Sequence, residues 1–412
     1  MINYLTAALI ILNLFISTSA KQDECPPAYS KCELGIEGYK NVHLIAHTHD
    51  DVGWKSTVDE FLYGKGTTGV QYILDTVVNE LSKNPTRKFI YVEMAFFARW
   101  WRQQNNATKE LVRTLVNERR LEFISGGWSM NDEATAYYAD IIDQHSFGLN
   151  FILNEFGPCA RPRIGWQIDP FGHSREQGSI FAQLGFDGLF IGRDDMLEEV
   201  FRAATKTREM VWKASPSLGK SSDIFNGILP INYGIYPSLC FDQNCQDDPI
   251  IDNPESDEFN VELKVAEFIA YTGFQAEQYK TNNLIMTFGS DFQFTNAHKN
   301  FKNIDKLIYH VNQRSNLTKV NMFYSTPSCY LYALYKSNIT WPVKEDDFFP
   351  YAHRSHSYWT GFYTSRAGLK DFVRRSNNFL QSVRHLSLYS KLTDQDTQNA
   401  FFKLDESMGI VQ

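Results

Sequence analysis

The sequence predicts an α/β fold in which strands and helices alternate for most of the chain and a helical segment follows. Two observations lead to this prediction. Short apolar runs recur along the chain and are separated by amphipathic helical patterns. Polar residues follow several of these runs, as they do at the carboxyl ends of strands in α/β proteins. We therefore expect a parallel sheet or barrel, followed by a helical bundle.

The predicted strands are short apolar runs. They lie at 42–46, 89–92, 121–124, 164–168, 188–191, 284–288 and 321–324. Helical periodicity predicts helices at 70–81, 111–116, 138–156, 261–279 and 301–313. The segment 206–254 is rich in Asn, Asp, Ser, Gly and Pro, which is typical of long loops and short strands. Two further helical segments are expected, one from 366 onward with Phe372, Phe379 and Leu380 on its apolar stripe, and one at 395–411.

The composition indicates a large globular protein. The 412 residues are 43% hydrophobic, which is enough for a large core in one big domain or two. The formal net charge is -8, and because nucleic-acid partners require basic surfaces, this acidity argues against them. Aromatic residues make up 15% of the chain, and we expect most of them in the core, although rings also stack on sugars.

The N-terminal segment 1–20 resembles a secretory signal peptide. It is uncharged, with an apolar run at 7–16 that is too short for a membrane span, and no later stretch is long and apolar enough for one. The acceptor motif for N-glycosylation occurs at Asn106, Asn316 and Asn338. We therefore expect a protein of the secretory pathway.

The chain contains six cysteines, and an oxidising compartment favours disulfide bonds among them. Cys240 and Cys245 are close enough in sequence to close a small loop; the alternative is a pair of thiolate metal ligands, but the chain has no second such pair. A bond between Cys32 and Cys329 would join the start of the first strand to a late element. Spacing alone does not fix the connectivity, so these pairings stay open at this point.

The segment 47–54, His-Thr-His-Asp-Asp-Val-Gly-Trp, follows the first predicted strand. His47, His49 and Asp51 are spaced by two, so in an extended backbone their side chains project to the same side. Two imidazoles and a carboxylate supply three ligands of a zinc site, or two ligands and a residue that orients them. The alternative is a polar junction whose histidines bond to the backbone. Trp54 would supply a flat apolar surface beside the metal.

Asp169 follows the predicted strand 164–168 and is a natural further ligand. A carboxylate bound to a metal ion stays ionised and can also act as the nucleophile of a retaining glycosidase. The alternative is a turn residue before Pro170.

Asp291 follows the apolar strand 284–288 and is the candidate for a second carboxyl group, which must carry a proton to protonate a leaving oxygen. A helix cap or a turn is the alternative. Arg193 would orient a carboxylate or a substrate hydroxyl, unless it is a surface residue, and His173 either supports the site or is a structural histidine. Glu93 also follows a predicted strand, without an assigned role.

Four segments together resemble glycoside hydrolase family 38. They are 47–54 (HTHDDVGW), 126–133 (GGWSMNDE), 168–174 (IDPFGHS) and 289–293 (GSDFQ). The resemblance runs from about residue 41 to the end of the chain, and the first and third segments are highly specific. It implies a zinc-dependent exo-α-mannosidase that releases terminal α-linked mannose with retention from the N-glycans and other oligosaccharides of glycoproteins, in the lysosome or outside the cell.

The resemblance also implies roles for individual residues. His49, Asp51 and Asp169 would bind one Zn²⁺, with Asp169 also the nucleophile and Asp291 the acid/base. In the family, zinc binds sugar hydroxyls and aids ring distortion. The residues that would line the mannose pocket are Trp54, Phe171, Arg193 and Tyr233. The pairings Cys32–Cys329 and Cys240–Cys245 are similar to those of the family.

For the fold, the resemblance implies a seven-stranded α/β barrel as catalytic domain at 21–360 and the beginning of a three-helix-bundle domain at 361–412, cut short. In the family, a segment like 406–412 leads into a His-His-Asp motif that supplies a fourth zinc ligand, and this chain stops before it. The alternative function is therefore a truncated, catalytically incompetent secreted fragment. Sequence leaves open whether the protein forms an oligomer.

A third hypothesis is a barrel metal hydrolase of the amidohydrolase or polysaccharide-deacetylase kind, which also has histidines and aspartates at strand ends. Such enzymes activate a metal-bound water, and they would form no covalent bond between Asp169 and a sugar. The combined motifs favour family 38.

Overall fold

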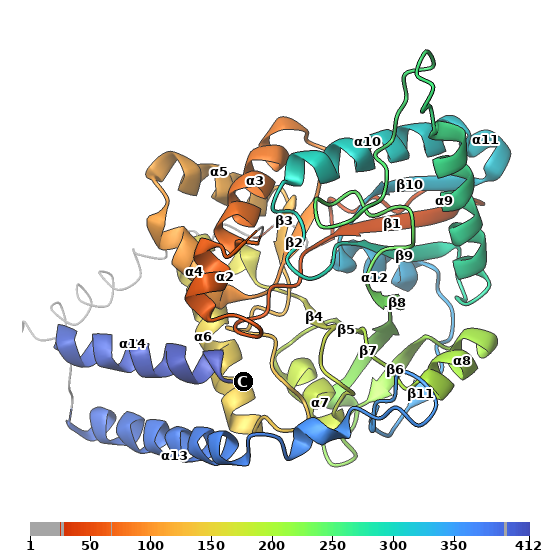
Figure 1. Cartoon of the computed structure of the whole chain (residues 1–412). Coiled ribbons are helices and arrows are strands. Elements are labelled where there is room, and N and C mark those ends of the chain that lie inside the picture. The colour runs from red at the N-terminus through yellow and green to blue at the C-terminus, as the bar shows by residue number, and fades with distance from the viewer. Residues whose placement is uncertain (1–24, 26–28, 67, 391–393) are drawn as a thin grey trace, which may run out of the picture.

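The computed structural model describes residues 25, 29–66, 68–390 and 394–412, so the predicted signal peptide at 1–20 lies outside the described residues. The strands gather in the middle of the molecule and helices surround them, while two long helices near the C-terminus extend along one side (Figure 1). No helix in the described ranges is long and apolar enough to cross a membrane.

All of the predicted apolar runs form strands, and the irregular segment 206–254 contributes three more. The strands are β1 (Lys40–Ala46), β2 (Phe89–Tyr91), β3 (Leu121–Phe123), β4 (Ile164–Gln167), β5 (Gly188–Ile191), β6 (Glu209–Lys213), β7 (Asp223–Ile228), β8 (Pro230–Tyr233), β9 (Asn283–Phe288), β10 (Val320–Tyr324) and β11 (Val343–Lys344). Every residue of β1 beyond Lys40 is buried, which is typical of a strand whose two faces are both covered.

The helices lie between the strands, as the periodicity predicts, with additional short ones. They are α2 (Val58–Tyr63), α3 (Val70–Lys83), α4 (Met94–Gln103), α5 (Asn106–Asn117), α6 (Tyr138–Phe156), α7 (Arg175–Gln183), α8 (Met196–Thr205), α9 (Val261–Ala276), α10 (Ala297–Gln313), α11 (Ser315–Thr318), α12 (Pro327–Lys336), α13 (Ala367–Ser390) and α14 (Gln395–Ile410). Helix α3 buries Val70, Ile73, Leu74, Val77 and Leu81, the apolar face that its spacing predicts.

The strands form a mostly parallel arrangement in three sheets. One sheet has the order β10-β1-β9, a second has the order β11-β6-β7-β5-β4, and β2 pairs with β3. The exception to parallel pairing is β6, which runs antiparallel to β7. Parallel strands direct their carboxyl ends to the same side, so residues that follow β1, β4, β5 and β9 are brought toward a common region.

No closed barrel is found among the described strands, in contrast to the seven-stranded barrel expected from the resemblance. Between β3 and β4 the contact is made by Ser125: its backbone N–H donates to the Ile164 carbonyl at 2.8 Å, the Trp166 N–H donates to its hydroxyl at 2.7 Å, and that hydroxyl donates to the Trp166 carbonyl at 3.4 Å. The three-residue strands β2 and β3 are too short to extend a ladder further. Ser125 thus connects the two sheets by isolated hydrogen bonds, without a continuous strand ladder between them.

Disulfide bonds hold distant parts of the chain together. Cys32, ahead of β1, is bonded to Cys329 in α12, and Cys240 is bonded to Cys245 within a loop. Cys25, whose partner the sequence leaves open, is bonded to Cys159. All six cysteines are therefore paired.

Helices α13 and α14 lie side by side, next to α6 (Figure 1). Arg384 of α13 connects the three helices, because its guanidinium lies 2.7 Å from Asp143 of α6 and 2.7 Å from Asp405 of α14. The predicted apolar stripe of α13 is only partly covered. Leu380 is buried, but Phe372 is 66% and Phe379 62% exposed.

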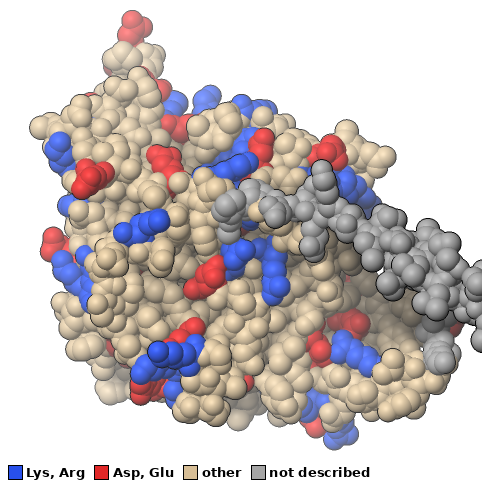
Figure 2. Space-filling model, turned by 180° about the vertical axis from the view of Figure 1, so that it is seen from behind, with Lys and Arg blue, Asp and Glu red and all other residues tan. Residues whose placement is uncertain are grey.

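The surface carries charges of both signs. On the face opposite to that of Figure 1, Lys and Arg side chains alternate with Asp and Glu side chains in small groups (Figure 2). The modest net acidity of the chain is thus spread over this face rather than gathered in one patch of a single sign.

Candidate active site

The polar segment after β1 is fixed in place beside the segment after β9. His49 and Asp291 form an isolated parallel β-bridge beyond the ends of the two strands. The His49 N–H donates to the Ser290 carbonyl at 3.2 Å, and the Phe292 N–H donates to the His49 carbonyl at 2.9 Å. The backbone therefore holds the candidate ligand His49 next to the candidate acid/base Asp291.

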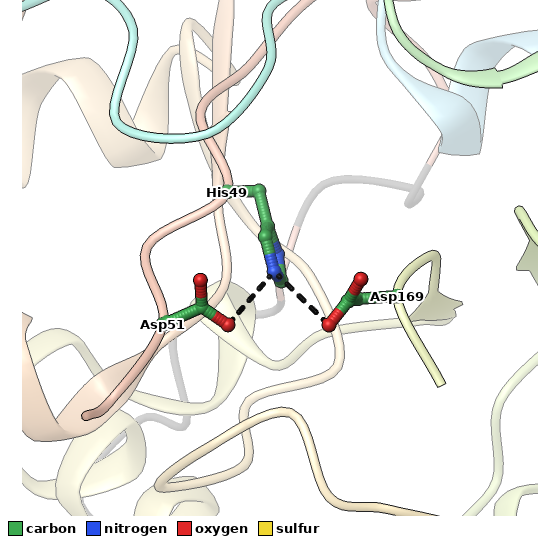
Figure 3. A group of neighbouring side chains, drawn as sticks. All are labelled: His49, Asp51 and Asp169. Carbon is green, nitrogen blue, oxygen red and sulfur yellow. Dashed lines mark ion pairs between the residues drawn. The ribbon is translucent and has the colours of Figure 1, made fainter. Parts of the chain in front are cut away.

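His49, Asp51 and Asp169 converge on one point (Figure 3). The Nε2 atom of His49 lies 3.3 Å from Oδ1 of Asp51 and 3.6 Å from Oδ2 of Asp169. One ligand atom from each residue can be chosen so that all lie within 4.8 Å of one another. An imidazole and two carboxylates in this arrangement are a donor set that suits a divalent cation such as zinc.

The polar atoms of His49 fit a cation at this point. The ring is 3% exposed, and neither nitrogen has a hydrogen-bond partner among the described residues. A buried polar atom without a partner is costly, and a metal ion would satisfy Nε2. Burial lowers the pKa of His49, but the close carboxylates of Asp169 and Asp51 raise it well above its usual value overall. The two carboxylates thus attract a positive charge to this point, and a bound cation would take the place of the proton.

His47 is not part of this group. It is fully buried, and its Nε2–H donates to the backbone carbonyl of Tyr233 at 2.9 Å. Burial lowers the pKa of His47 to about 4, which keeps the ring neutral. Of the two histidines in the motif, His47 therefore has the structural role that the sequence left as an alternative.

Asp169 is held between the candidate metal ligands and Arg193. Its Oδ2 faces His49, while its Oδ1 accepts hydrogen bonds from Arg193 Nη2 at 2.7 Å and Nε at 3.2 Å. Burial alone would raise the pKa of Asp169, but His49 and Arg193 hold it well below its usual value. The carboxylate is therefore ionised, as a metal ligand or a nucleophile must be.

Tyr233 connects the two candidate catalytic carboxylates. Its hydroxyl donates to Asp291 Oδ1 at 3.0 Å and lies 3.4 Å from Asp169 Oδ1, and Arg193 Nη2 donates to it at 3.4 Å. Because one hydroxyl reaches both carboxylates, the two groups lie close together. A close pair is what a retaining glycosidase requires, with a separation of about 5–5.5 Å.

Aromatic rings surround the Arg193 guanidinium. Its central carbon lies 5.2 Å from the ring centre of Phe171 and 5.0 Å from that of Trp359, with Tyr233 at 5.6 Å. Trp359 is not among the residues that the sequence analysis selected. It comes from a segment without helical or strand periodicity, and an aromatic residue there gives no signal of its position in the fold.

A cavity of about 240 Å³ opens beside the ligands. His49, Asp51, Asp169, Phe171 and Glu93 are among its lining residues, together with Phe362 from the segment after Trp359. Trp54 is 56% exposed, outside this lining, and the ammonium group of Lys55 lies over its ring at 3.8 Å.

His173 lies behind the loop that carries Asp169. It is fully buried and its Nδ1 lies 2.8 Å from Oε1 of Glu133, whose other oxygen accepts the Ser174 N–H at 2.7 Å. The segments 126–133 and 168–174 are thus joined by a buried polar network. This network fixes the loop between β4 and α7 from which Asp169 and Phe171 project.

The three glycosylation motifs lie on the surface. Asn106, Asn316 and Asn338 are all exposed, so each is accessible to a modifying enzyme. Their glycosylation remains a prediction.

Comparison with known proteins gives a consistent result. Residues 40–354 match the model of the glycosyl hydrolases family 38 N-terminal domain. The chain is 51% identical over 387 residues to the lysosomal alpha-mannosidase of Cavia porcellus, an alignment that covers 92% of this chain and 38% of that protein. It is 51% identical over 364 residues to the lysosomal alpha-mannosidase of Homo sapiens, with 87% of this chain and 36% of that protein covered. The chain thus spans little more than a third of the length of these relatives.

Among solved structures, the fold is similar to that of an alpha-mannosidase from Enterococcus faecalis. The TM-score is 0.56 at 16% identity, over 75% of this chain and 30% of that chain. At this identity the likeness concerns the fold alone.

Proposed function

The chain belongs to glycosyl hydrolase family 38, and from this premise we propose that it carries the catalytic centre of a zinc-dependent retaining exo-α-mannosidase. The observation that carries the proposal is the convergence of His49, Asp51 and Asp169 next to a second carboxylate, Asp291, with the Tyr233 hydroxyl between the two acidic groups. The proposed substrate is terminal α-linked mannose on the N-glycans of glycoproteins.

His49, Asp51 and Asp169 would hold one Zn²⁺. When bound, the metal supplies a Lewis acid for sugar hydroxyls and favours distortion of the ring. The unpartnered Nε2 of His49 supports this assignment, because that buried atom otherwise lacks a hydrogen bond.

In the first step that we propose, a carboxylate oxygen of Asp169 attacks the anomeric carbon and forms a covalent ester with the sugar. The bond from that carbon to the glycosidic oxygen breaks with its electron pair, and Asp291 donates its proton to the leaving oxygen. The ionised state of Asp169, stabilised by Arg193, suits it for attack.

In the second step, Asp291 is the base. It takes a proton from a water molecule whose oxygen attacks the anomeric carbon, so that mannose is released and the Asp169 carboxylate is restored. Two inversions at the same carbon give net retention. Arg193 and Tyr233 keep the two carboxylates oriented through both steps by the hydrogen bonds described above.

The proposed setting is the secretory pathway, with the lysosome or the extracellular space as destination. The disulfide bonds support it, because such bonds persist in oxidising compartments. We further propose that 21–360 is the catalytic domain and that 361–412 begins a helical-bundle domain.

The test is hydrolysis of an aryl α-mannoside by the zinc-loaded chain, compared with Asp169→Asn, together with trapping by a 2-deoxy-2-fluoro mannosyl fluoride. We expect a covalent sugar on the peptide that contains Asp169, and loss of hydrolysis in the variant. Hydrolysis that survives Asp169→Asn would contradict the proposal. Zinc binding without hydrolysis would instead favour the alternative of a catalytically incompetent fragment.

A further inference from the structure

Glu93 is a buried carboxylate at the candidate site to which the proposed function gives no role. It follows β2 at its carboxyl end, on the same side of the molecule as the metal ligands, and it lines the same cavity. The side chain is 1% exposed, yet neither carboxylate oxygen has a hydrogen-bond partner among the described residues. It precedes the first turn of α4 but makes no side-chain cap there. Burying a carboxylate without partners is costly, so a specific acceptor function would account for its place.

A group beside Glu93 that needs an acceptor is His49. Oε1 of Glu93 lies 3.9 Å from Nδ1 of His49, and that nitrogen also lacks a hydrogen-bond partner. The other nitrogen, Nε2, faces Asp51 and Asp169. Glu93 therefore lies on the side of the ring that is turned away from the candidate metal position. It is about 1 Å beyond hydrogen-bond distance, a gap that rotation of its flexible side chain can close.

A second buried carboxylate in the same region, Asp50, is already satisfied. Thr48 Oγ1 donates to its Oδ1 at 2.8 Å and the Tyr91 hydroxyl donates to its Oδ2 at 3.0 Å. Each oxygen of Asp50 thus has a donor, whereas both oxygens of Glu93 remain free to accept. Of the two carboxylates, Glu93 is the one that has acceptor capacity to offer His49.

We propose that Glu93 is a positioning residue for the metal site: it accepts the Nδ1–H of His49 and so holds the tautomer whose Nε2 lone pair faces Asp51 and Asp169. The inference rests on the proposed function, since it concerns the same site. Metal-binding histidines commonly donate their other N–H to a carboxylate, which fixes the orientation of the ring and raises the basicity of the ligand. Glu93 would act through His49 and would not itself touch the metal or the sugar.

The first experiment measures Zn²⁺ affinity of the full chain by competition with a chromogenic chelator. The variants are Glu93→Leu, which removes the acceptor, and Glu93→Gln, which keeps a neutral acceptor oxygen. Glu209→Gln is the matched control, because Glu209 is also a buried glutamate with one unpartnered oxygen but lies in β6, away from the ligands. We expect Glu93→Leu to lose about 10–100-fold in affinity, Glu93→Gln to lose less, and Glu209→Gln to match the wild type.

The second experiment examines the metal-free chain at a pH above the raised pKa of His49, where the ring is neutral, so that it does not depend on catalysis or on zinc. Nitrogen chemical shifts of ¹⁵N-histidine, assigned by comparison with His49→Asn, report which ring nitrogen carries the proton. We expect a protonated Nδ1 in the wild type, and a shift of the population toward a protonated Nε2 in Glu93→Leu. A wild-type ring that carries its neutral-state proton on Nε2 would overturn the proposal.

Thermal unfolding of the metal-free variants separates positioning from a merely structural role. Replacing a buried polar group that has no partner by an apolar one tends to stabilise a protein, so Glu93→Leu should unfold at the same or a higher temperature while it binds zinc more weakly. Wild-type zinc affinity in Glu93→Leu would overturn the inference and leave the proposed function intact. If the wild type itself binds no zinc, the metal part of the proposed function fails, and the tautomer measurement still decides the role of Glu93.

Discussion

The hydroxyl of Tyr233 contacts both candidate catalytic carboxylates and Arg193. It donates to Asp291, lies next to Asp169 and accepts from Arg193. Burial and the two nearby carboxylates raise the pKa of Tyr233, so the hydroxyl keeps its proton and remains a donor. A donor that stays protonated can hold Asp291 in a fixed position while that carboxyl gains and loses its own proton.

We therefore expect Tyr233→Phe to lower kcat for an aryl α-mannoside while leaving zinc affinity unchanged. A hydrogen bond to a charged group contributes about 1.5–3 kcal/mol, which corresponds to a loss of about 10–150-fold in rate. Steady-state kinetics and chelator competition measure the two effects. The control is Tyr236→Phe, which removes a buried hydroxyl that donates to Gln275 outside the site. Equal losses in the two variants would contradict a specific role for Tyr233.

At the level of residues, the sequence predicts the polar side chains that follow strands, but not the side chains from irregular segments that surround them in the site. His49, Asp51, Asp169 and Asp291 each follow a predicted strand, and the structure brings them together. Trp359 lies far along the chain in irregular backbone, so no periodicity predicts that its ring packs on Arg193. The neutral state of His47 also depends on a tertiary contact, the Tyr233 carbonyl, that sequence spacing does not reveal.

At the level of elements, local patterns determine most strands and helices, whereas the connection between sheets depends on tertiary contacts. The apolar runs at β1 and β9 are long enough to pair over six residues, from Asn41 with Asn283 to Ala46 with Phe288. By contrast, β3 meets β4 through the backbone and hydroxyl of Ser125. Sequence periodicity predicts where strands occur but carries no information about a junction made by one serine, so it cannot show whether the sheets close into a barrel.

The disulfide between Cys32 and Cys329 joins the segment before β1 to α12, across a sequence separation of 297 residues. A covalent link that closes so long a loop strongly restricts the unfolded chain. The bond between Cys240 and Cys245 spans a separation of only 5 residues and restricts it much less. The two bonds should therefore differ in their effect on stability.

We expect the double variant Cys32→Ser/Cys329→Ser to lose about 2–5 kcal/mol of unfolding free energy. The matched control, Cys240→Ser/Cys245→Ser, should lose clearly less, since it opens a small loop. Urea unfolding of the metal-free chains under identical non-reducing conditions measures both. Equal losses would show that local packing at the cysteines, rather than loop length, determines the effect.

At the level of the whole molecule, several buried carboxylic acids make stability depend on pH. Burial raises the pKa of Glu209 from 4.5 to about 8, although Tyr330 donates a hydrogen bond to it. Burial, together with the charge of Glu198, raises the pKa of Asp194 from 3.8 to about 8. Glu209 lies in β6, and Asp194 lies between Arg193 and the start of α8. In the folded protein, each of these two acids keeps its proton at pH values where the same group in the unfolded chain is ionised.

The sign of the effect follows from proton counting. Between about pH 4.5 and 8 the folded protein binds a proton at Glu209 that the unfolded chain does not, so unfolding releases a proton and becomes easier as the pH rises. The stabilising contribution is fully present below about pH 4.5 and is lost as the pH approaches 8, by up to roughly 1.4 kcal/mol per pH unit. Asp194 acts in the same direction, so both groups favour the fold under acidic conditions.

Glu209→Gln replaces this acid by a neutral amide of similar shape and should flatten the pH dependence. We expect the urea midpoint of Glu209→Gln to match that of the wild type near pH 5 and to exceed it near pH 7.5. At the higher pH, ionisation of Glu209 stabilises the unfolded wild-type chain, whereas the folded wild type keeps this acid protonated. The control is Glu277→Gln, whose side chain is 81% exposed and should change neither midpoint. The contradicting outcome is a Glu209→Gln midpoint that is lower than that of the wild type by the same amount at both pH values. It would mean that the Tyr330–Glu209 hydrogen bond outweighs the cost of the buried acid. The pH dependence of this fold would then arise from other groups.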